Sequence, residues 1–147
     1  MKKIIAQNKK ARFDYEILDT TEAGVELKGF EVKSVRAGKV SIKESYAKFV
    51  RDELWLIGAN INKYEHLAER EYDPTRSRKL LLSRKELKKM FSQTKEKGLT
   101  IVPLDIHLLN NRWVKLTLGV AKGKKRFDKR ETIKRREQDR ELRRKFG

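Results

Sequence analysis

The chain has 147 residues, no cysteine, and 38 Lys and Arg against 21 Asp and Glu, which gives a formal net charge of +17. The lack of cysteine excludes disulfides, thiolate zinc sites and cysteine nucleophiles, and no apolar run approaches the roughly 18 residues that span a membrane. The length predicts one domain plus a tail. The excess of positive charge favours a nucleic-acid partner over an anionic membrane, and we expect a cytoplasmic protein.

The first part of the chain is patterned mainly as β-strands. Apolar and polar residues alternate there, as they do in a strand with one buried face. The expected strands are residues 13–19, 25–28, 40–50 and 54–61, with turns at 20–24 and 51–53. One stretch differs, because Val32 and Val35 lie three positions apart. Lys33 and Arg36 fall on another face, so residues 30–36 predict one or two helical turns.

The clearest helical pattern covers residues 83–97 and follows a long polar loop at 62–78. Ser83 and Glu86 have the spacing of a capping box, in which each side chain bonds the other residue's backbone N–H. Gly98 stands at the position where a helix commonly ends. We therefore expect one longer helix in addition to the short one.

Two further strands are expected over residues 99–109 and 112–121. Asn110 and Asn111 lie between them and can adopt the positive φ angles of a tight hairpin turn. Alternation in the second strand places Lys115 outside, while the core side holds Val114, Leu116, Leu118 and Val120. A helix followed by a closing hairpin favours a mainly β fold, a small antiparallel OB-like β-barrel.

Residues 122–147 form a basic tail that lacks a core. They contain thirteen Lys and Arg and five acids, so they contribute +8 and the preceding chain keeps +9. Four large apolar side chains cannot offset the entropy of ordering, so we expect the tail to be disordered when free. Acid–base pairs four residues apart favour a helix once a polyanion binds. A solvated tail with incidental charge is the alternative. The expected domains are an N-terminal arm (1–12), a barrel (13–121) and the tail (122–147).

Nothing in the sequence points to catalysis or to a cofactor. His107 lies in an expected strand and fits a structural or surface role. His66 has acidic neighbours in the polar loop, a grouping that chance alone produces, so we expect no metal. Residues 119–125 resemble a phosphate-binding loop, but they are one residue short and lack the Ser or Thr that follows the lysine. We expect phosphate contact there without nucleotide hydrolysis, and no enzyme.

Several blocks carry a resemblance to a known family. They are residues 8–12, 22–24, 29–38, 58–61, 73–82, 119–125 and 128–130. The longest are EVKSVRAG and DPTRSRKLLL. From about residue 8 to its end, the chain resembles the small protein B family, the bacterial partner of transfer-messenger RNA (tmRNA).

The resemblance implies an OB-type barrel that binds the tRNA-like domain of tmRNA and delivers it to stalled ribosomes for rescue by trans-translation. The tail would enter the decoding centre of the small subunit and run helically into the empty message channel. Elongation factor Tu and alanyl-tRNA synthetase would be partners through the RNA. A general OB-fold RNA-binding or ribosome-associated protein is the alternative.

The family's RNA-binding positions fall on Asn8, Glu22, Leu81 and Lys115. Leu81 could equally belong to the core. Glu22 can accept a hydrogen bond from a base amino group or a 2′-OH, order nearby arginines, or hold the expected turn at Gly24. With nearby basic residues, the expected RNA-binding set is Asn8, Lys9, Arg12, Glu22, Lys33, Arg36, Arg76, Arg78, Lys79, Leu81, Lys115, Lys122 and Lys124.

The ribosome-binding part of the tail is expected around the Asp128-Lys129-Arg130 motif of the family. The full set is Lys125, Arg126, Phe127, Asp128, Lys129, Arg130, Lys134 and Arg135. Phe127 stands where relatives often have His. Both side chains can stack on a base, but Phe cannot form a hydrogen bond or carry a charge.

Overall fold

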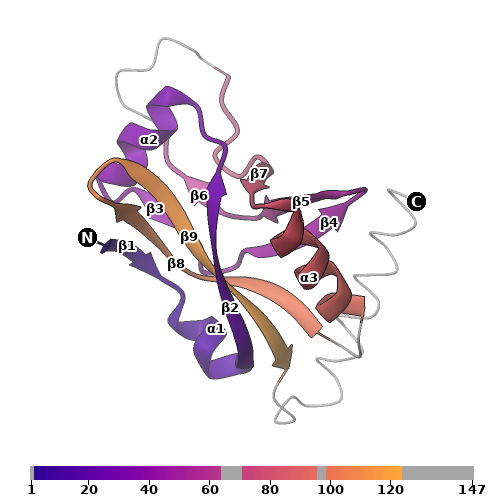
Figure 1. Cartoon of the computed structure of the whole chain (residues 1–147). Coiled ribbons are helices and arrows are strands. Elements are labelled where there is room, and N and C mark those ends of the chain that lie inside the picture. Colours follow the sequence, from indigo (N-terminus) through magenta and orange to yellow (C-terminus); the bar gives the residue numbers. More distant parts are fainter. Residues whose placement is uncertain (1, 64–70, 96–98, 124–147) are drawn as a thin grey trace.

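A computed structural model of the chain describes residues 2–63, 71–95 and 99–123. Its elements, in chain order, are β1 (Lys2–Gln7), α1 (Lys9–Asp14), β2 (Tyr15–Val25), α2 (Gly29–Arg36), β3 (Val40–Ser41), β4 (Tyr46–Val50), β5 (Glu53–Ile57), β6 (Asn60–Ile61), β7 (Arg78–Leu81), α3 (Arg84–Lys95), β8 (Leu99–Leu109) and β9 (Trp113–Gly123). The prediction of a mainly β protein with a few helices is confirmed. Figure 1 shows α1 and α2 at opposite ends of the long strand β2.

The strands form one antiparallel sheet that closes on itself. Its order is β1-β8-β4-β5-β7-β2-β9, and β9 also pairs with β8. The strands from β8 round to β9 therefore make a closed ring, while β1 lies beside β8 outside it. Only β3 and β6 stand apart among the described strands, as a separate pair. Closure leaves the long strands β2, β8 and β9 paired on both sides and rigidly placed.

The core fills the ring with side chains from every part of the described chain. Its most deeply buried members include Val35, Ile42, Leu54, Ile61, Met90, Ile101, Leu116 and Leu118. Met90 comes from α3, which packs an apolar face onto the strands. A smaller cluster around Ala11 and Leu104 seats α1 against β8 and β9.

Local signals predict their elements well. The helical turns expected at 30–36 are α2, and Ser83 and Glu86 form the reciprocal capping bonds at the start of α3. Asn110 and Asn111 both have positive φ, at 53° and 56°, in the hairpin between β8 and β9. These features depend on residues a few positions apart, which is why the sequence shows them.

The residues expected as a separate arm instead form β1 and the start of α1. Lys2 to Gln7 pair with the second half of β8. The strand β4 pairs with β8 only at Ala47 and Ile101, so that half of β8 would otherwise be an open edge. Half-buried Ile5 packs against the core from this position. Pairing partners far along the chain thus convert a basic segment into part of the sheet.

Three other boundaries differ from the prediction. The turn expected at 20–24 lies inside β2, because Thr20 to Gly24 pair continuously with β9. The strands expected at 40–50 and 54–61 are each broken in two, the second at Gly58, whose φ is +84°. Inside the segment expected to be a loop, β7 begins at Arg78 and pairs with β5 and β2.

Candidate nucleic-acid interface

Three of the four family positions lie together on neighbouring strands. Gly24 on β2 pairs with Lys115 on β9 and with Leu81 on β7, and Glu22 is two residues before it. We call Glu22, Gly24, Leu81 and Lys115 the strand patch. Leu81 is 48% exposed and therefore does not belong to the core. Glu22 lies within a strand, so it holds no turn at Gly24.

Gly24 makes room at the centre of the strand patch. A Cβ on Gly24 would lie 3.3 Å from the Leu81 Cβ and 3.5 Å from the Lys115 Nζ. The ammonium of Lys115 therefore sits over bare backbone, with an exposed leucine on the other side. A cation beside an apolar surface and a carboxylate can contact a phosphate, a base face and a 2′-OH of one nucleotide stretch.

A buried polar network lies beside the strand patch on the neighbouring strand β8. His107 on β8 is fully buried, its Nδ1 lies 2.6 Å from Asp105 Oδ1, and its Nε2 lies 3.1 Å from Glu22 Oε2. Thr117 donates to Asp105 at 3.1 Å, and Lys2 Nζ lies 3.5 Å from the other Asp105 oxygen. The expected structural role of His107 agrees with its burial. In the part of the chain that is described, no group of three or more His, Cys, Asp or Glu side chains is arranged to hold a metal ion.

Asn8, the fourth family position, lies away from the strand patch and is buried. It caps α1 by accepting a hydrogen bond from the Ala11 N–H. Its amide also donates to the backbone oxygens of Ile42, at 3.2 Å, and Pro103, at 3.0 Å. These bonds use the polar atoms of the side chain to join α1 to the sheet.

The expectation that Arg78 contacts RNA needs correction, because the side chain is fully buried. It donates to Glu31 Oε2 from Nε at 2.9 Å and from Nη2 at 2.7 Å. Arg76 also pairs with Glu31 and is only partly exposed. Burial alone would raise the pKa of Glu31. Hydrogen bonds from Arg76, the Lys28 backbone, Tyr72 and Arg78 outweigh it and hold the pKa at about 2.

Tyr72 completes this cluster and lies close to β6, because its oxygen is 3.1 Å from the backbone oxygen of Ile61. Its hydroxyl donates to Glu31 at 2.8 Å, and its ring meets Phe30 edge to face with centroids 4.8 Å apart. Burial, followed by the bond to the Glu31 carboxylate, raises the pKa of Tyr72 to about 12. The cluster therefore fastens α2 to the segment before β7, and it gives Arg76 and Arg78 a role in the fold.

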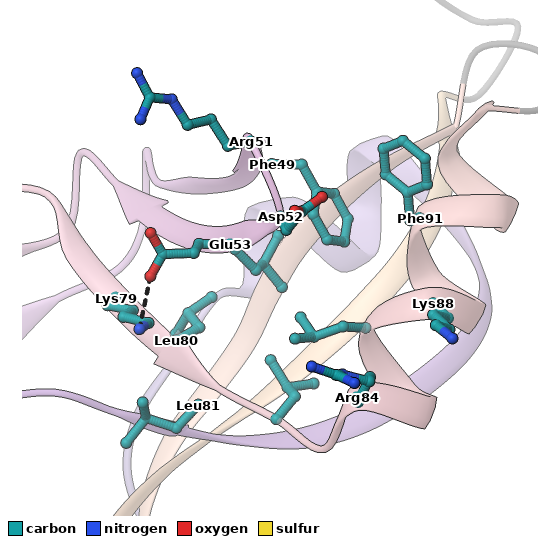
Figure 2. Close-up of a pocket in the computed structure, with 13 residues that line it drawn as sticks. Phe49, Arg51, Asp52, Glu53, Lys79, Leu80, Leu81, Arg84, Lys88 and Phe91 are labelled. Atoms are coloured by element: carbon teal, nitrogen blue, oxygen red, sulfur yellow. Dashed lines mark ion pairs between the residues drawn. The ribbon is translucent and has the colours of Figure 1, made fainter.

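A groove of about 660 Å³ begins at Leu81 and runs between α3 and the strands (Figure 2). Phe49 and Phe91 meet in it edge to face, with ring centroids 5.3 Å apart. Lys79 lies on its strand side, and its ammonium is 2.6 Å from Glu53. The side-chain hydrogen bond with Glu53 raises the pKa of Lys79. Three further basic side chains line the groove, namely Arg51, Arg84 and Lys88.

The other expected basic residues are exposed but dispersed. Lys33 and Arg36 lie on α2, at the strand-patch end of β2, whereas Lys9 and Arg12 lie on α1 at the opposite end (Figure 1). Lys122 lies on β9 opposite Glu16, also far from the strand patch along β2. Lys124 and the whole expected ribosome-binding set, 125–135, fall outside the described residues.

Sequence reasoning missed two features of this surface. The groove joins Phe49 and Phe91, which are far apart in the chain, so no local pattern reveals it. Trp113, at the start of β9, is 57% exposed and has the Arg112 guanidinium 5.8 Å from its ring centroid. The apolar alternation that follows Trp113 suggests that its ring is buried. The ring is exposed because Trp113 lies at the hairpin end of β9. Exposed aromatic faces of this kind can stack on bases.

The protein combines a closed antiparallel β ring, a patch with a cation, a carboxylate and an exposed leucine, and a net charge of +17. These features define the class of small basic β proteins that bind nucleic acids. Every helix in the described ranges is too short or too polar to cross a lipid bilayer.

The family model of the SmpB protein matches residues 5–147, and the chain belongs to this family. It is 51% identical over 143 residues to the SsrA-binding protein of Fusobacterium nucleatum, covering 97% of this chain and 96% of that one. Identity to the SsrA-binding protein of Gloeothece citriformis is 50% over 143 residues, 97% of this chain and 92% of that one. A solved structure described as "tmRNA-SmpB: a journey to the center of the bacterial ribosome" contains a chain with 48% identity and a TM-score of 0.69, covering 84% of this chain and 87% of that one.

Proposed function

We propose that this protein is an RNA-binding adaptor of trans-translation, which binds the tRNA-like domain of tmRNA and delivers it to stalled ribosomes. The observation that carries the proposal is the nearly full-length similarity, at about half identity, to proteins described as SsrA-binding. The strand patch supports it, because three expected RNA-binding positions that are distant in sequence meet on one surface. The activity is binding and positioning of RNA on the ribosome in the cytoplasm, without catalysis by this chain.

The basic tail supplies the second half of the proposed activity. Residues 124–147 carry twelve Lys and Arg against five acids. We propose that this segment enters the decoding centre and folds as a helix in the message channel, where ribosomal phosphates replace the apolar partners that the tail lacks. The ribosome and the tRNA-like domain would then be bound by different parts of the protein. Elongation factor Tu and alanyl-tRNA synthetase would join through the RNA.

A gel-shift competition separates this function from general RNA binding. At moderate salt, the protein should prefer a transcript of the tRNA-like domain of tmRNA over bulk tRNA and over random RNA. Equal affinity for all three would favour a general RNA binder. The same assay tests the patch, because Lys115→Ala should weaken binding and lower the salt slope by about 0.7 to 0.9, the loss of one phosphate contact.

The matched control is Lys43→Ala, which removes an exposed lysine from the segment between β3 and β4. It should leave the preference for tmRNA intact. If Lys115→Ala and Lys43→Ala behaved alike, Lys115 would not belong to the interface.

A further inference from the structure

Beside the strand patch, one imidazole lies between two carboxylates. His107 Nδ1 is 2.6 Å from Asp105 Oδ1, and His107 Nε2 is 3.1 Å from Glu22 Oε2. The imidazole is fully buried, whereas the Glu22 side chain is 44% exposed. A buried group thus holds one oxygen of a partly exposed carboxylate, and Glu22 lies opposite Thr117 on β9, two residues along that strand from Lys115.

This arrangement has a proton requirement. A neutral imidazole donates from one nitrogen only, and ionised carboxylates are acceptors only. Two nitrogen-to-carboxylate bonds therefore need one more proton than a neutral His107 with ionised Asp105 and Glu22 provides. Without that proton, a nitrogen lone pair would face a carboxylate oxygen across the shorter or the longer of the two contacts.

The surrounding charges indicate which contact depends on the proton. Asp105 has two further partners, the Thr117 hydroxyl at 3.1 Å and the Lys2 ammonium at 3.5 Å. Both favour an ionised Asp105 that accepts from Nδ1. The cross-strand partner of His107 on β9 is a further cation, Lys115. Thr117 and Lys2 hold Asp105 but not Glu22, so the contact with His107 Nε2 is the one that fixes the Glu22 carboxylate.

We propose that His107 is a positioning residue for RNA recognition, and this rests on the proposed function. With the extra proton, Asp105 fixes the ring through Nδ1, and Nε2–H donates to Glu22 Oε2. Glu22 Oε1 then accepts from a ribose 2′-OH or a base amino group next to the phosphate contact of Lys115. When the imidazole is replaced, this bond to Glu22 is lost and Glu22 Oε1 is no longer held in place. RNA affinity then falls.

The experiment measures the affinity for a transcript of the tRNA-like domain of tmRNA in wild type, H107Q, E22Q and the double variant H107Q/E22Q. H107Q and E22Q should each lose about tenfold in affinity relative to the control K43A, the equivalent of roughly one charge-assisted hydrogen bond. The double variant should lose no more than E22Q alone, because His107 acts on the RNA only through Glu22.

A second measurement needs no RNA. The ¹⁵N shifts of the His107 ring in the free protein report which nitrogens carry protons, and they should differ between wild type and E22Q at low pH. Thermal unfolding monitors the fold, and E22Q changes an exposed side chain, so it keeps the test open if H107Q fails to fold.

Additive losses of affinity in the double variant, or ring shifts that E22Q leaves unchanged, would overturn the inference. Absence of RNA binding by wild type would instead remove the proposed function, while the ring shifts would still decide whether His107 holds Glu22.

Discussion

Arg76, Arg78 and Lys79 look alike in the sequence but have different environments. Arg78 points inward and is fully buried against Glu31, Arg76 reaches the same carboxylate from a partly exposed position, and Lys79 pairs with Glu53 at the surface. The alternation of the strand that begins at Arg78 separates Arg78 from Lys79, whereas Arg76 precedes the strand. A basic motif in a nucleic-acid-binding protein can therefore stabilise the fold before it contacts any phosphate, and burial decides which residues remain available.

Glu31→Gln should destabilise the protein by about 3 to 5 kcal/mol, because it leaves the guanidinium of Arg78 buried without its counter-charge. The folded pKa of Glu31 is about 2, below its usual 4.5. The ionised carboxylate therefore stabilises the fold fully above about pH 4.5, and this contribution of roughly 3 kcal/mol is lost as the pH falls toward 2. Urea unfolding across this window measures it.

The variant Glu44→Gln is the matched control, because Glu44 is exposed on the segment between β3 and β4. Its unfolding free energy should follow that of wild type at every pH. An acid-dependent loss of stability that persisted unchanged in Glu31→Gln would show that other carboxylates cause it.

At the scale of elements, the sequence predicts what depends on near neighbours. The capping box of α3, the turns of α2 and the hairpin at Asn110 and Asn111 are each set within a few residues. It does not predict β1, β7 or the unbroken β2, because their strand state comes from pairing with β8, β5 and β9. The same limit applies to the site: alternation places Lys115 outside, but only the register brings Leu81 and Gly24 beside it.

The hairpin between β8 and β9 offers a test at this scale. Asn110 and Asn111 have φ values of 53° and 56°, the conformation of a two-residue turn with both central φ angles positive. Asn111→Gly should stabilise the protein by a few tenths of a kcal/mol, while Asn111→Val should destabilise it by about 1 to 2 kcal/mol. The Arg36 guanidinium donates to the backbone oxygen of Asn111, which both variants keep. Thermal unfolding measures the stability of both variants. Equal stability of Asn111→Val and Asn111→Gly would contradict the positive φ at this position.

At the scale of the whole molecule, the buried core and much of the positive charge lie in different parts of the chain. The buried apolar residues of the described core all lie at or before Ala121, whereas residues 124–147 hold twelve Lys and Arg against five acids. Removing them takes away a net +7 and leaves +10 on the remaining chain. The two proposed activities, binding tmRNA and engaging the ribosome, should therefore separate at Gly123, the last residue of β9.

Truncation after Gly123 should leave the melting temperature close to that of the full chain, because the described core stays complete. Binding of the tRNA-like domain should persist with a smaller salt slope, since Lys115 and the rest of the strand patch remain. Tagging of stalled ribosomes in a reconstituted translation system should be abolished, because the proposed contacts with the decoding centre and message channel are lost. A full-length variant with Ala at Lys129, Arg130, Lys134 and Arg135 is the matched control for chain length and should show the same separation. Full tagging by the truncated protein would exclude the proposed role of the tail, and loss of RNA binding by a folded truncated protein would move the interface away from the strand patch.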